Sequence, residues 1–171
     1  MTSTQTTLTG ERADLVQTLD RHRGFLRFTV RGLTDEQASR RTTASELNLA
    51  GLLKHVAHTE AKWAGFAQRG AEAFDFGNWS EEAWRAEWQL QPGETLASVL
   101  AEYEEISRRT DELVATLDLD VSYPLPQAPW FEPGAEWSVR RTFLHVIAET
   151  AQHAGHADII RESIDGQKTM G

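Results

Sequence analysis

Four long stretches of this 171-residue chain repeat apolar side chains at intervals of three and four residues. That spacing is the period of an amphipathic helix. The stretches cover residues 11–30, about 48–69, 95–117 and about 138–164. Long helices that each carry one apolar face bury those faces best against one another, so the sequence predicts an all-α fold of four long antiparallel helices packed as a bundle.

Capping residues stand at the expected helix ends. Thr34 is followed three residues later by Gln37, the pattern of a capping box, which predicts a short helix directly after Thr34. Asn48 and Ser138 are expected N-caps of the second and the last long helix, and Gly166 is the expected stop of the last helix.

Two connections between the long helices are themselves long. Ser80 and the glutamates after it predict a short helix between the second and third long helices. Residues 118–136 contain four prolines and a glycine, which a regular helix does not tolerate, so we expect a long loop before the last helix. Long loops in compact domains often cover a binding site.

Composition narrows the class of protein. Hydrophobic residues make up 40% of the chain and charged residues 25%, the balance of one water-soluble domain, which we expect to span residues 1–171. The formal net charge of −9 argues against nucleic acid as a partner. The sequence shows neither a membrane-spanning run nor a secretory signal, so we expect a cytoplasmic protein without a membrane partner. There is no cysteine, which excludes a cysteine ligand or nucleophile.

A histidine and a glutamate interrupt the apolar face of the last helix. His153 falls on the helix between Val146 and Ile160, at the centre of the face that points to the core. Glu149 lies one turn earlier and points the same way, since residues four apart share a helix face. A buried histidine needs a hydrogen-bond partner or a metal ion, and the periodicity alone leaves both interpretations open.

A third ligand would have to come from another helix. The period of the second long helix places His55 near its apolar face and turns His58 away, so His55 is the favoured candidate. On the last helix, His145 and His156 fall at the edge of the core face or towards solvent. His22 falls on the inward side of the first helix, as a core residue or a neighbour of the site.

Three segments resemble a known family. Residues 141–162, RTFLHVIAETAQHAGHADIIRE, resemble the last-helix signature of the DinB-like superfamily, in particular the branch related to mycothiol-dependent maleylpyruvate isomerase. Residues 49–63, LAGLLKHVAHTEAKW, are similar to the second-helix signature of that branch, and residues 32–37, GLTDEQ, to its first turn. The resemblance implies a DinB/YfiT-like four-helix bundle and, since members often pair through their helices, a homodimer.

The resemblance also implies a metal site. Many members of the superfamily hold the metal with three histidines, and the motif positions here carry His55, Glu149 and His153, the His-Glu-His variant of the mycothiol-linked branch. Three protein ligands leave a coordination position open for substrate, as in catalytic sites. Zinc is the expected ion, with nickel, iron or manganese compatible with the same ligand types.

The function implied is activation of a low-molecular-weight thiol, by resemblance mycothiol, for S-transfer to a small electrophile or for its isomerisation. Trp63, Trp130 and Trp137, with the loop at 118–136, are the expected pocket walls. The sequence names no catalytic residue beyond the metal ligands. A metal-dependent hydrolase and a non-catalytic, stress-related metal-binding bundle remain as alternatives, because a fold does not determine a function.

Overall fold

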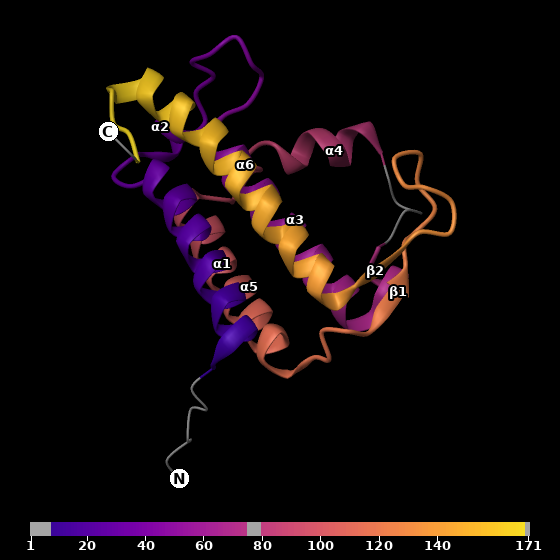
Figure 1. The fold of residues 1–171 in the computed structure, drawn as a ribbon. Coiled ribbons are helices and arrows are strands. Elements are labelled where there is room, and N and C mark those ends of the chain that lie inside the picture. Colours follow the sequence, from indigo (N-terminus) through magenta and orange to yellow (C-terminus); the bar gives the residue numbers. More distant parts are fainter. Residues whose placement is uncertain (1–7, 75–79, 170–171) are drawn as a thin grey trace.

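Four long helices lie alongside one another in the computed structural model, which describes residues 8–74 and 80–169 (Figure 1). They are α1 (Gly10–Thr29), α3 (Leu49–Arg69), α5 (Leu96–Thr116) and α6 (Val139–Asp165). Helix α6 packs against α1 and α3, and α5 packs against the other sides of the same two helices. The all-α, DinB-like architecture expected from the sequence is therefore confirmed. Within the described ranges, no helix is both long and apolar enough to span a membrane.

The connections carry five short elements: α2 (Asp35–Ala38), the 3₁₀ helix η1 (Gly70–Ala73), α4 (Glu81–Glu87), β1 (Ser122–Pro124) and β2 (Glu136–Ser138). The expected loop before α6 is present, but its two ends pair as antiparallel strands, which the sequence pattern did not predict. The pairing sets Tyr123 opposite Trp137, a cross-strand aromatic pair of the kind that stabilises short ribbons.

The long helices are not all antiparallel to their neighbours, contrary to the expectation. Arg140, at the start of α6, bonds to Glu11 at the start of α1. Arg161, near the end of α6, donates to the carbonyl oxygens of Thr29 and Arg31 at the end of α1. Helices α1 and α6 therefore run parallel.

The long connection between α3 and α5 explains this arrangement. Residues 70–95 carry the chain, with α4, back along the bundle. Glu94, just before α5, consequently meets Lys54 near the start of α3, with 2.6 Å between the Lys54 Nζ and a carboxylate oxygen. Helix α5 starts at the same end of the bundle as α3, so these two neighbours are also parallel.

Four of the predicted caps are formed. The side chains of Asn48 and Ser138 each accept a hydrogen bond from an N–H of the first turn of their helix. Thr34 and Gln37 make both bonds of a capping box. Gly166 ends α6 in the left-handed conformation, with φ of 78°.

The core consists of two apolar clusters. One packs around Leu52 and Ile160 and the other around Phe66 and Phe143. Burial of each such side chain contributes about 1.5–3 kcal/mol. Between the clusters, at mid-height of the bundle, each long helix contributes buried polar side chains: Arg23, Glu60, Ser107, Thr110 and Thr150.

Candidate metal centre

The structure brings together His55, Glu149 and His153. One nitrogen or carboxylate oxygen from each side chain lies within 4.8 Å of the others. Glu149 and His153 share a face of α6 because they are four residues apart. His55 comes from α3, which packs against α6 and runs antiparallel to it.

The three side chains lie at a partly open position between α3 and α6. The Nε2 of His153 is 3.6 Å from a carboxylate oxygen of Glu149. The rings of His55 and His153 meet edge to face, with centroids 5.0 Å apart and an angle of 82° between the planes. The side chain of Glu149 keeps 29% of its surface exposed, so a small molecule can reach the carboxylate from solvent.

His55 is held as a neutral imidazole. Its Nδ1 is buried and has no hydrogen-bond partner among residues 8–74 and 80–169, and its Nε2 lies 3.5 Å from the Oγ1 of Thr59. Burial and, next, the charge of His153 lower the pKa of His55 to about 4. A buried ring nitrogen without a partner is costly. A metal ion would satisfy a lone pair of this ring.

Glu149 is held as a carboxylate. The hydrogen bond from His153 lowers the pKa of Glu149, burial opposes that effect, and the charge of His145 lowers the pKa further. The site therefore offers two imidazoles and one carboxylate, a ligand set that catalytic zinc sites use. The residues present fit a divalent cation.

Two further histidines touch the proposed ligands, although the helical period placed both at the edge of α6. The Nδ1 of His156 lies 3.4 Å from the Nδ1 of His153, so one ring can donate to the other. The Nε2 of His145 lies 3.6 Å from a carboxylate oxygen of Glu149. Outer partners of this kind orient metal ligands. At 100° per residue, His145 and His156 lie about 80° and 60° around the helix from His153, which is close enough for their side chains to reach the proposed ligands.

Trp88 is a neighbour of the site that sequence reasoning missed. Its ring stacks on His55, with centroids 4.0 Å apart and planes within 20° of parallel. Its ring also lies 6.2 Å from the ring of His153. Trp88 follows directly after α4. It was missed because no periodic pattern in the sequence indicates that the end of α4 packs against α3.

The remaining histidines are engaged elsewhere. The Nδ1 of His58 lies 3.0 Å from both carboxylate oxygens of Glu87, and its Nε2 lies 3.6 Å from Glu102. The hydrogen bond to Glu87 raises the pKa of His58, against the effect of burial. His22 is half-buried on α1, where its ring meets that of a phenylalanine. This geometry agrees with the choice of His55 over His58.

The three tryptophans expected in a pocket occupy different environments. Trp63 and Trp137 stack, with centroids 4.9 Å apart, and the ring of His145 lies edge-on to both, at 4.6 and 4.9 Å. Trp63 is 7% exposed and belongs mainly to the core, whereas Trp130 is 71% exposed. The ring of Phe131 lies between Trp130 and Trp137, with its centroid 6.1 Å from that of Trp130 and 5.9 Å from that of Trp137.

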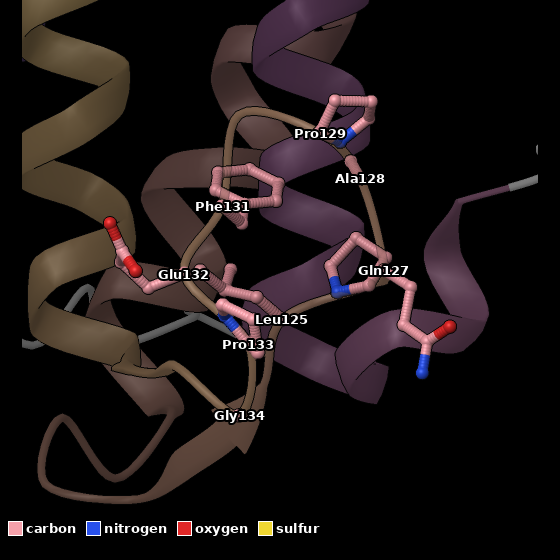
Figure 2. Close-up of a pocket in the computed structure, with 9 residues that line it drawn as sticks. Leu125, Gln127, Ala128, Pro129, Phe131, Glu132, Pro133 and Gly134 are labelled. Carbon is pink, nitrogen blue, oxygen red and sulfur yellow. The ribbon is translucent and has the colours of Figure 1, made fainter.

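A cavity of about 520 Å³ lies within the loop that β1 and β2 hold closed. Figure 2 shows the loop curving around it, with Gln127 and Glu132 pointing away on opposite sides. Phe131 lines the cavity and touches Trp137, which touches His145 beside Glu149. The cavity is thus connected to the three converging side chains through a row of neighbouring rings. The other lining residues are Leu125, Pro126, Ala128, Pro129, Pro133 and Gly134.

Comparisons with known proteins agree on this architecture. A conserved protein from Enterococcus faecalis of known structure superposes with a TM-score of 0.68, at 14% identity, over 94% of this chain and 100% of that protein, which shows a shared fold. A search of curated proteins finds no match. Residues 14–166 match the family model described as mycothiol-S-transferase. The chain therefore belongs to the mycothiol-S-transferase family, a DinB-like family.

Proposed function

We propose that this protein is a metal-dependent mycothiol S-transferase that joins the sulfur of mycothiol to a small electrophile. The family's name denotes mycothiol as a small-molecule thiol substrate. The observation that carries the proposal is the convergence of His55, Glu149 and His153 within 4.8 Å. These three side chains would hold the ion, with zinc as the first choice and nickel, iron or manganese compatible with the donors.

The ion would supply Lewis acidity, which lowers the pKa of a thiol so that the reactive thiolate forms near neutral pH. The transfer breaks the S–H bond, whose proton passes to solvent, and a sulfur electron pair forms the bond to the electrophilic carbon. In a substitution the leaving group departs with its bonding electrons. In an addition the π electrons move to the neighbouring atom, which takes up a proton from solvent. The absence of cysteine from the chain means that the protein supplies no thiol of its own for this reaction.

The protein's own residues bind and orient the reactants. His145 and His156 hold Glu149 and His153 at their outer sides. On the other side of His145, the ring of Trp137 stacks on the buried ring of Trp63 and carries the guanidinium of Arg141 over it, 4.7 Å from the ring centroid. We assign Trp137, with Trp130 and the cavity inside the loop, to the electrophile, since small-molecule sites are concave and mostly apolar.

The test is a thiol-dependence assay on purified, zinc-loaded protein. Mycothiol and a bimane electrophile are mixed with the protein, and the fluorescent thioether is measured. We expect protein-dependent adduct formation with mycothiol, and its loss in His153→Ala together with the loss of zinc uptake. The matched control is His22→Ala, which removes a half-buried histidine on α1 and should leave both activity and zinc uptake unchanged.

Two results would overturn the proposal. Zinc uptake that persists in both Glu149→Ala and His153→Ala would show that these residues are not the ligands. Adduct formation that stays at the uncatalysed rate with mycothiol, cysteine and other cellular thiols would exclude the transferase activity. Turnover of an ester or amide without any thiol would instead indicate a hydrolase.

The domain organisation, the location in the cell and the oligomeric state are also proposals. We propose that residues 1–171 form one domain, that the protein acts in the cytoplasm, where thiols are kept reduced, and that it forms a homodimer. The exposed apolar side chains Leu144 and Ile159, on the outer face of α6, support pairing through helices. Light scattering coupled to size-exclusion chromatography tests the oligomeric state, and a monomer at micromolar concentration would exclude the dimer.

A further inference from the structure

The C-terminal end of α4 is fixed to the first turns of α3. The Nδ2 of Asn48 donates to the carbonyl oxygen of Trp88 at 3.2 Å. One turn later, the backbone of Gly51 comes so close to Trp88 that a Cβ on Gly51 would lie 2.0 Å from that same carbonyl oxygen. Only glycine fits at this position, because the obstacle is backbone rather than a movable side chain.

Lys54 adds a third attachment on the same face of α3. Its Nζ donates to the carbonyl oxygens of Ala86 and Gln89, at 3.2 and 3.3 Å. It is neutralised by Glu94, with 2.6 Å between Nζ and the nearer carboxylate oxygen. The residue is 5% exposed, and a buried ammonium with a complete set of acceptors is held in one geometry. The backbone on both sides of Trp88 is therefore immobilised.

This attachment places the Trp88 ring flat on His55. Metal-binding histidines ordinarily donate their second ring N–H to a carboxylate, a carbonyl or water, which fixes the plane of the ring. His153 has such a partner in His156. Within the part of the chain that the structure describes, the one polar partner of the His55 ring is the Thr59 hydroxyl, at 3.5 Å. Packing under Trp88 is therefore the main restraint on the plane of the His55 ring.

We propose that Trp88 is a positioning residue for the metal centre: its indole holds the His55 ring in the plane that the ion requires. Asn48, Gly51 and Lys54 act through it, since they fix the place of Trp88 on α3. The inference rests on the proposed function, because it assumes that His55 is a ligand. It gives the residue at the end of α4, a short helix outside the signature segments in the sequence, an indirect part in metal binding.

The test compares zinc affinity and the visible spectrum of the cobalt-loaded protein across three variants. Trp88→Ala should weaken zinc binding by roughly 10- to 100-fold, the usual effect of losing an outer partner of a ligand. It should also shift the d–d bands of bound Co²⁺. Trp88→Phe keeps a flat ring over His55 and should restore most of the affinity. Trp130→Ala is the matched control, because it removes an indole that is 71% exposed and meets Phe131 rather than His55, so zinc affinity and the Co²⁺ spectrum should stay unchanged.

Gly51→Ala tests the same inference without removing the indole. Its Cβ must push the Trp88 backbone away, so zinc affinity should fall as in Trp88→Ala. The control is Gly24→Ala on α1, where a Cβ meets nothing within 4 Å. Circular dichroism of the metal-free proteins verifies that each variant is folded.

The outcomes separate this inference from the proposed function. Wild-type protein that takes up no zinc refutes both. If the wild type binds zinc and His153→Ala does not, then unchanged affinity and an unchanged Co²⁺ spectrum in Trp88→Ala overturn the positioning role alone. If Trp88→Ala does not fold, wild-type affinity in Gly51→Ala overturns it.

Discussion

Replacing Arg23 with methionine should destabilise the fold by about 3–5 kcal/mol, the cost of stranding a buried charge. Arg23 is completely buried, and its guanidinium bonds to both carboxylate oxygens of Glu60, at 2.6 and 3.2 Å. It also bonds to Asp111 at 2.9 Å. Burial lowers the pKa of Arg23, but the charge of Glu60 and the bonds to it raise the pKa above the ordinary value overall. Methionine keeps most of the volume and leaves Glu60, which is 1% exposed, without its cation.

Urea denaturation of metal-free protein measures the loss, and thermal melting should show a fall in Tm of about 6–20 °C for a chain of this size. The double variant Arg23→Met, Glu60→Leu removes both charges and should regain most of the lost stability, since an apolar pair of similar volume replaces a buried ion pair at little cost. A single variant that loses less than about 1 kcal/mol, or a double variant as unstable as the sum of the two single ones, would refute this reasoning.

Three shorter predictions concern the metal centre. Without metal, the contribution of His55 to stability should be full above pH 6.5 and fall as the pH drops towards 4, by up to about 3 kcal/mol, because the unfolded chain protonates His55 in that window and the folded one does not; relative to the wild type, His55→Asn should lose this component in urea titrations, and identical slopes would contradict the assignment. His156→Ala should weaken zinc binding about 10-fold by removing the partner of His153, measured by chelator competition; unchanged affinity would show that His156 has no orienting role. At zinc concentrations of about 1,000 times Kd, chelation should remove about 4 kcal/mol of stability from the wild type and none from His153→Ala, and an equal loss in both would place the ion elsewhere.

The sequence predicts well those features that depend on neighbours along the chain. The caps at Thr34, Asn48 and Ser138 are formed as expected, because a side chain and the N–H three residues later belong to the same turn. Glu149 and His153 share a face for the same reason. Their meeting with His55 follows from the period of two helices that pack together. Periodicity and resemblance favoured the same three residues, and their role as metal ligands stays a prediction.

Features that depend on contacts between segments far apart in the sequence could not be predicted. The stacking of Trp88 on His55 is set by Gly51 and Lys54, which fix the end of α4, and neither residue shows this partner in a local pattern. The strand pairing of Tyr123 with Trp137 joins residues on either side of a proline-rich loop. The parallel direction of α1 and α6 depends on the path of the connections rather than on the helix sequences.

The β1–β2 ribbon allows the loop that encloses the cavity to change in sequence independently of the proposed metal centre. The ribbon closes the loop on itself, and the backbone N–H of Val139 donates to the Val121 carbonyl at 2.8 Å, so the first residue of α6 is anchored outside the loop. Residues 125–134 can therefore be lengthened, shortened or exchanged as a cassette without moving Glu149 or His153. If the proposed function holds, libraries confined to these ten positions should change which electrophiles are accepted while leaving the proposed metal centre unaltered.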